Sequence, residues 1–248
     1  KERMLIRIPF SIHVEETELT RKFASRPFVP SVMAERNLRC EEILTIQAMG
    51  LKKRLAHAHA KSAVVGISGG LDSTLALLVS AKAFDALGMD RSGITAVTMP
   101  CFGTTDRTYQ NACKMSLKLG ATLREIPVGV AVEQHFKDIG HDPEDHSVTY
   151  ENSQARERTQ VLMDVANQTG GIVIGTGDMS ELALGWATYN GDHMSMYGVN
   201  ASVPKTLVRH LVHYYADTCK DQELKDVLYD VLDTPVSPEL LPPKDGEI

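Results

Sequence analysis

The sequence predicts an α/β domain built on a doubly wound parallel sheet with helices on both faces. Short β-branched segments alternate with longer segments whose apolar residues recur at helical spacing. Parallel strands need helical crossovers of this kind. In addition, the first expected strand ends at a glycine-rich turn that opens a helix, SGGLDS at residues 68–73.

The first half of the expected sheet lies between residues 63 and 128. The β-branched run 63–67 predicts a strand, and apolar residues at helical spacing from Leu71 predict a helix that ends at Gly88. The following expected elements are a strand at 94–98, a helix at 105–119 that Gly120 terminates, and a strand at 123–128.

The second half continues the alternation. The expected elements are a helix at 154–167, a strand at 171–175 and a helix at 179–186. Ser202 is expected to cap a further helix, with Pro204 in its first turn and Lys205 at its positive end. Ligands of doubly wound sheets bind at the carboxyl ends of the strands, so residues that directly follow strands are the first functional candidates.

The sequence divides into three zones. Residues 1–40 hold a short apolar run, Met4 to Ile8, and then a proline-punctuated stretch, and are expected to be the end of a preceding domain and a linker. Residues 41–248 are expected to form the main domain. Within it, residues 217–248 are expected to supply a helix and then a mobile, proline-rich loop.

The composition excludes several classes of protein. The 248 residues carry a net charge of −6, which argues against nucleic acid or an anionic membrane as a partner. The four cysteines are far apart, without a C-x-x-C pair, so free thiols are expected. Since no stretch approaches 18 apolar residues, the expected location is the cytoplasm.

The turn SGGLDS has the properties of an anion cradle. Glycines let the backbone approach a ligand, and the N–H groups and dipole of the following helix attract negative charge. Ser68 and Ser73 add hydroxyl donors, and Asp72 is a candidate magnesium ligand. A G-x-x-x-x-G-K-[ST] loop is absent from the sequence, which excludes an ordinary Walker site.

Two other interpretations of this turn remain open. The first is a glycine turn in which Asp72 or Ser73 only caps the helix. The second is a nucleophile elbow, because Gly66 to Gly70 fits G-x-S-x-G around Ser68. That hydrolase needs a later acid and histidine, for which the sequence offers Asp178 or Asp192 followed by His193, His210 or His213.

A second cluster follows the strand at 171–175. In GTGDMSE, Asp178 and Glu181 have the spacing of a capping box, which by itself explains both. In a doubly wound sheet this strand end shares a crevice with Asp72, so Asp72 and Glu181 are also candidate ligands of one magnesium ion.

Basic residues near two expected helix starts also suggest an anionic ligand. Arg156 and Arg158 follow the expected start at 154, and Lys205 follows Pro204. A cation at the start of a helix is unfavourable by about 0.3–1 kcal/mol, because it opposes the helix dipole. These residues are either solvated surface charges or contacts for an anionic ligand that offsets this cost. His210, His213 and Asp217 have the spacing of a metal triad, although ordinary surface positions explain them equally.

These segments resemble a known family. SGGLDS resembles the pyrophosphate loop of the N-type ATP pyrophosphatases, which have an adenine nucleotide alpha hydrolase-like fold. YENSQARERTQ, GTGDMSELALGWATYNGDHMS and NASVPKTLVR resemble the synthetase domain of glutamine-dependent NAD synthetases, over about residues 36–241. The resemblance implies a ligase in which Mg-ATP adenylates the nicotinate carboxylate of deamido-NAD and releases pyrophosphate. Ammonia then displaces AMP to give NAD.

The resemblance also implies roles for individual residues, with Mg²⁺ as cofactor and ATP as co-substrate. The implied ATP-binding residues are Gly66, Ile67, Ser68, Gly69, Gly70, Leu71, Asp72, Ser73, Thr176, Lys205, Arg156 and Ser237. The implied deamido-NAD residues are Asn152, Glu181, Trp186, Ala187, Thr188, Tyr189 and Asp192, and the implied metal ligands are Asp72 and Glu181. No side chain is expected to act as a general base or nucleophile.

The implied partners are ammonia, a nitrilase-like glutaminase domain in the full-length chain, and a second copy in a homodimer or higher oligomer. Two alternative functions remain. One is another adenylating amidotransferase of the same superfamily, and the other is a nucleotide-binding module without catalysis.

Overall fold

The computed structural model describes residues 5–18, 20–24, 27–30, 32–235 and 240–241. Its centre is a five-stranded sheet in the order β3-β2-β1-β4-β5, in which every neighbouring pair is parallel. The strands are β1 (Ala63–Gly66), β2 (Ile94–Thr98), β3 (Thr122–Glu125), β4 (Ile172–Gly175) and β5 (Tyr197–Gly198). The direction in which the strands are added reverses between β1 and β4, which creates the crevice expected of a doubly wound sheet.

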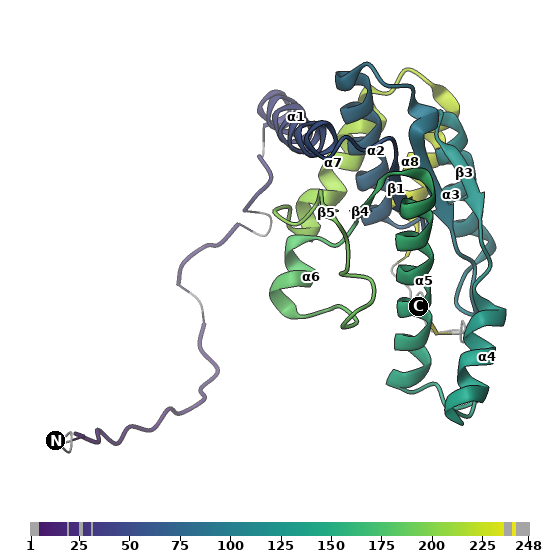
Figure 1. The fold of residues 1–248 in the computed structure, drawn as a ribbon. Helices are drawn as coiled ribbons and strands as arrows, with labels where there is room; N and C mark the ends of the chain where they lie inside the picture. The colour runs from purple at the N-terminus through teal and green to yellow at the C-terminus, as the bar shows by residue number, and fades with distance from the viewer. Residues whose placement is uncertain (1–4, 19, 25–26, 31, 236–239, 242–248) are drawn as a thin grey trace.

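Helices cover both faces of this sheet (Figure 1). One face carries α1 (Met33–Ala58), α2 (Leu71–Leu87), α3 (Asp106–Lys118), α7 (Lys205–Thr218) and α8 (Gln222–Asp233). The other face carries α5 (Val148–Thr169), beside which α4 (Gly129–Ile139) packs. Along β1 the side chains alternate between two cores, since Val65 belongs to the first and Val64 to the second. The predicted fold class is confirmed.

Several predicted boundaries agree with the structure. The strand at 94–98 is β2, and the helix that begins at Leu71 is α2. Gly88 ends α2 in the left-handed conformation, with φ of +67°. The helix α3 begins after Thr105, whose side chain accepts a hydrogen bond from the backbone N–H of Thr108.

Other local predictions were wrong. The helix expected from residue 154 begins six residues earlier, at Val148, and the strand expected to reach Val128 ends at Glu125. Pro204, not Ser202, is the N-cap of α7, and Lys205 is its first residue. The helices α1 and α4 and the two-residue β5 were not predicted from the sequence.

The segment before α1 forms no helix or strand in its described residues. Its described residues, 5–18, 20–24 and 27–30, run away from the domain in Figure 1. The boundary expected at residue 40 lies within α1, where Cys40 is 1% exposed. The division into two domains stays a prediction.

Two short elements complete the fold. The helix α6 (Met179–Leu184) follows β4, and the 3-10 helix η1 (Arg91–Gly93) precedes β2. In the described part of the chain, every helix is too short or too polar to cross a membrane.

Candidate active site at the carboxyl ends of the strands

The loop between β1 and α2 brings backbone N–H groups to the carboxyl end of the sheet. Gly69 has φ of +85°, and a Cβ atom on it would lie 2.2 Å from the carbonyl oxygen of Thr108. Only glycine fits this position without strain. Gly70 is the N-cap of α2 and, among the described residues, no side chain caps that helix. The first-turn N–H groups are therefore available to an anion.

The hydroxyls of this loop are held close to it. Ser73 is 4% exposed and donates to the carbonyl of Gly70 at 3.1 Å, while its Oγ lies 3.4 Å from Ser68 Oγ. The side chain of Ile67 is buried in the core, so this residue offers only its backbone to the site. Gly66 and Leu71 bound the loop at the last residue of β1 and the first of α2.

A capping box shapes the loop between β4 and α6. Asp178 Oδ1 accepts hydrogen bonds from the N–H groups of Ser180 at 2.6 Å and Glu181 at 3.0 Å. Glu181 Oε2 accepts one from the N–H of Asp178 at 3.1 Å. The predicted capping box is confirmed. It fixes both carboxylates beside the start of α7.

Lys205 joins the two loops. Its Nζ lies 2.6 Å from Asp72 Oδ2, 2.8 Å from Asp178 Oδ2 and 2.9 Å from Glu181 Oε1. One oxygen of each carboxylate lies within 4.8 Å of the others. Asp72 and Glu181 therefore share one crevice, as expected. Asp178 is a third member that the sequence did not predict, because its capping role already explained it.

Burial and charge oppose each other in this cluster. Burial raises the pKa of Asp72 to about 6, although Lys205 acts in the other direction. Burial also disfavours the charged form of Asp178, but hydrogen bonds from Lys205 and backbone N–H groups outweigh it and lower the pKa. The three carboxylates likewise outweigh burial at Lys205 and raise its pKa.

The donor set suits a magnesium ion. Three carboxylates face one ammonium group, so the ionised cluster keeps an excess of negative charge. The buried Oδ1 of Asp72 has no hydrogen-bond partner among the described residues, which leaves it free to bind a cation. Magnesium prefers one or two carboxylates together with phosphate oxygens. Asp72 itself belongs to the SGGLDS turn, next to the N–H groups that are available to an anion.

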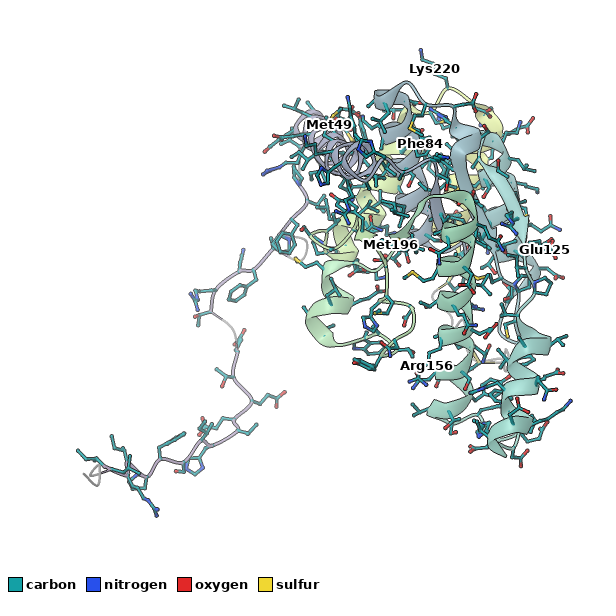
Figure 2. All side chains as sticks on the ribbon, viewed as in Figure 1. Met49, Phe84, Glu125, Arg156, Met196 and Lys220 are labelled. Carbon is teal, nitrogen blue, oxygen red and sulfur yellow. The ribbon has the colours of Figure 1, made fainter. Side chains whose placement is uncertain are left out.

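The loop after α6 is held against α5. Thr188 Oγ1 donates to Asn152 Oδ1 at 2.7 Å, and the N–H of Thr188 donates to Asp192 Oδ1 at 2.7 Å. Arg156 Nε donates to the carbonyl of Tyr189 at 3.1 Å, and Figure 2 shows Arg156 on the part of α5 that faces this loop. Four residues of the implied deamido-NAD set thus lie together, with Arg156 of the implied ATP set bonded to one of them.

The same loop presents aromatic rings to solvent. Trp186 and Tyr189 are each 76% exposed, and Ala187 is also exposed. Single exposed apolar residues are ordinary, but two large rings on one short loop offer stacking surfaces for a planar group.

Lys205 lies at the positive end of α7, as predicted, and protein carboxylates already face its ammonium group, whereas the predicted place of Arg156 near a helix start is wrong. Because α5 begins at Val148, Arg156 lies in its third turn, beyond the reach of the terminal dipole. Arg158 differs from Arg156: it is partly buried, and its Nε has no hydrogen-bond partner within the described chain. Sequence spacing could not separate these two arginines.

Ser237 lies outside the described residues. The nearby Leu240 is described, and its carbonyl accepts a hydrogen bond from Gln154 Nε2 of α5 at 2.8 Å. Leu241 packs against a buried cluster that includes Phe136 and Tyr150. Residues 240–241 therefore lie against α5 near Gln154, two residues after Asn152.

The structure does not favour the hydrolase or the metal triad. Ser68 Oγ accepts from the N–H of Gly70 at 3.2 Å and lies beside Ser73, so its described partners are not histidines. His213 Nδ1 lies 3.0 Å from Asp217 Oδ2, but Asp217 also accepts hydrogen bonds from Arg36 and Tyr229. Asp217 thereby links three helices.

Thr176 is positioned through its backbone. Its carbonyl accepts a hydrogen bond from Asn200 Nδ2 at 3.0 Å. The same amide donates to the carbonyl of Asp72 at 3.0 Å. The role of Asn200 was not predicted, since a lone asparagine before a helix gives no signal of this kind in the sequence.

Comparison with known proteins identifies relatives of this chain. A model of the family described as NAD synthase matches residues 43–238. The chain is 47% identical over 235 residues to a glutamine-dependent NAD(+) synthetase of Mycobacterium leprae and 44% identical over 236 residues to that of Mycobacterium tuberculosis. It covers 34% and 35% of those two proteins, which in turn match 92% and 93% of the chain.

Solved structures agree with this result. Glutamine-dependent NAD+ synthetase from Acinetobacter baumannii, in complex with adenosine diphosphate, has a TM-score of 0.70 at 26% identity over 76% of this chain and 35% of that one. NMN synthetase from Francisella tularensis has a TM-score of 0.68 at 25% identity over 80% of this chain and 75% of that one.

Proposed function

Because the chain belongs to the NAD synthase family, we propose that it amidates deamido-NAD to NAD at the expense of ATP. In this reaction ATP adenylates the nicotinate carboxylate and pyrophosphate leaves, and ammonia then displaces AMP. One observation carries the proposal. At the crevice between β1 and β4, Asp72 of the SGGLDS loop lies in one cluster with Asp178, Glu181 and Lys205.

The loop and the cluster serve the ATP phosphates. The N–H groups of the first turn of α2, with Ser68 and Ser73, bind phosphate oxygens. Asp72 and Glu181 hold Mg²⁺, which when bound neutralises charge on the phosphates. Lys205 places a second positive charge beside the same oxygens. Thr176, Arg156 and Ser237 are further proposed ATP contacts.

The loop after α6 serves the acceptor. Trp186 and Tyr189 offer faces on which the acceptor's planar rings stack. Asn152, Thr188 and Asp192, already joined by hydrogen bonds, bind its polar groups. Glu181 and Ala187 complete the proposed set. The chemistry needs no protein nucleophile, since adenylation itself makes the carboxylate a good acyl donor.

The longer protein supplies the remaining parts of this proposal. The chain spans about a third of the length of the mycobacterial relatives. A nitrilase-like glutaminase domain outside residues 1–248 is proposed to deliver ammonia, and residues 1–40 are proposed to connect to it. A homodimer and a cytoplasmic location stay predictions.

The test is NAD formation from deamido-NAD, ATP and MgCl2, with ammonium in one reaction and glutamine in another. The proposal expects equal amounts of NAD, AMP and pyrophosphate with ammonium. A matched Asp72→Asn variant keeps the shape of the side chain but loses its charge, and is expected to lose turnover. Formation of ADP in place of AMP, or full activity of the variant, would contradict the proposed reaction.

A mononucleotide acceptor is the second candidate, because of the similarity to NMN synthetase. The higher identity to the mycobacterial NAD synthetases favours the dinucleotide. Parallel assays with deamido-NAD and its mononucleotide counterpart decide between them, since the preferred acceptor has the higher kcat/KM.

A further inference from the structure

Asn200 occupies a special position between β5 and α7. It is 0% exposed, and its Nδ2 donates one hydrogen bond to the carbonyl of Asp72 and one to the carbonyl of Thr176, both at 3.0 Å. Asp72 belongs to the first turn of α2, whereas Thr176 directly follows β4. One side chain thus bridges the two loops that carry the candidate site.

A second buried amide fixes the orientation of the first. Gln47 of α1 is 9% exposed, and its Nε2 donates to Asn200 Oδ1 at 3.2 Å and to the carbonyl of Val199 at 2.8 Å. Carbonyl oxygens only accept, so the Asn200 amide satisfies all of these partners in one orientation. The bridge is therefore anchored to α1.

The bridge spans a point where the sheet itself no longer connects the two strands. The pairing of β1 with β4 ends at Val65 and Ile174. Beyond that point the chains separate, one toward Asp72 and the other toward Asp178 and Glu181. The Asn200 amide replaces the missing ladder bonds.

We propose that Asn200 is a positioning residue that sets the separation between the carboxylate of Asp72 and those of Asp178 and Glu181. It acts on both loops through their backbone, and Gln47 keeps its amide in the required orientation. This inference rests on the proposed function, since the separation matters for a Mg-ATP complex held between the two loops. A residue that only stabilised the fold would leave the affinity for Mg-ATP unchanged in the folded protein.

The experiment compares two buried asparagines. Asn200→Leu keeps the number and branching of the side-chain heavy atoms and removes both bridging bonds. Asn111→Leu is the matched control, since Asn111 is 6% exposed and donates to Asp230 Oδ2 at 2.6 Å, where α3 packs on α8. Each variant is examined by its thermal midpoint and by calorimetric titration with Mg-ATP, at a temperature at which it is folded.

Loss of a side chain that orients metal ligands lowers metal affinity or activity by about 10- to 100-fold. We expect a loss of that size in Mg-ATP affinity for Asn200→Leu and none for Asn111→Leu. Equal affinities in the two variants would overturn the inference, whatever their thermal midpoints.

A second variant covers the case in which Asn200→Leu does not fold. Gln47→Leu leaves Asn200 in place but frees its amide, and is expected to weaken Mg-ATP binding less than loss of Asn200 itself. Wild-type affinity in Gln47→Leu would refute the anchoring role. Titration with Mg-ATP needs no acceptor, so a failure to amidate deamido-NAD would refute the proposed function without removing this test.

Discussion

Replacement of Lys205 by methionine is the most informative perturbation of the carboxylate cluster. Methionine keeps the length and apolar stem of lysine but removes the ammonium group, which lies within 3 Å of three carboxylates. Without magnesium the variant holds three facing carboxylates and no cation. We expect it to be less stable than the wild type and to regain stability when magnesium is added.

The magnitude follows from the exposure of each partner. Asp178 is 0% exposed, and removal of the cation that lies 2.8 Å from its buried Oδ2 costs about 1.5–3 kcal/mol. The side chains of Asp72 and Glu181 are 23% and 33% exposed, so their pairs contribute about 0–1 kcal/mol each. Because Lys205 is itself 43% exposed, we expect the total loss of stability from the three pairs to lie in the lower half of the summed range, at about 2–3 kcal/mol. For a chain of this size that corresponds to a fall in thermal midpoint of about 5–10 °C.

The assay is thermal unfolding in EDTA and in MgCl2. A cation present at 100 times its Kd stabilises the folded state by about 2.7 kcal/mol, enough to offset the loss. The wild type should gain less from magnesium alone, because its ammonium group already neutralises part of the cluster. The activity of the variant should fall by about 10²-fold or more, since the charge beside the phosphates is gone.

Lys118→Met is the control. Lys118 pairs with Glu223 at 2.5 Å on the surface, where the two side chains are 36% and 75% exposed. This variant should unfold close to the wild type and respond no differently to magnesium. If Lys205→Met had the wild-type midpoint in EDTA, or gained no more from magnesium than the wild type, the electrostatic account of the cluster would be refuted.

Three further predictions concern separate parts of the molecule. Gly69→Ala places a Cβ atom against the backbone of Thr108 and puts alanine in the left-handed conformation. It should lower the free energy of unfolding, measured in urea, by at least about 1–2 kcal/mol. Wild-type stability would contradict the close approach. Trp186→Ala should leave the thermal midpoint unchanged and raise the KM for deamido-NAD about 2- to 10-fold, with the KM for ATP as the internal control. Burial opposes ionisation of Asp217, but hydrogen bonds from Tyr229 and Arg36 outweigh it and lower the pKa. The stability that this carboxylate adds is present above its unfolded pKa of about 3.9 and is lost as the pH falls through the folded value. Asp217→Asn should therefore be less stable than the wild type at pH 7. In a series of unfolding measurements at decreasing pH, the difference between the two proteins should vanish at the acid end.

Much of the fold was predictable because its signals are local. The strand at 94–98, the helix that begins at Leu71 and its glycine cap at residue 88 follow from side-chain periodicity and backbone conformation. The capping box of Asp178 and Glu181 is likewise a contact between neighbours in the sequence. Boundaries were less accurate, because the start of α5 depends on packing against α4.

The sequence alone determined the fold class, the family resemblance and the loop types at the two strand ends, since each rests on residues a few positions apart. Only the tertiary structure decided that Lys205 binds Asp72, Asp178 and Glu181 together, that Arg156 and Arg158 differ, and that Asn200 bridges the loops. Contacts of this kind join residues more than 20 positions apart. They form because parallel strands bring their carboxyl ends to one edge of the sheet, and no local pattern specifies which side chains meet there.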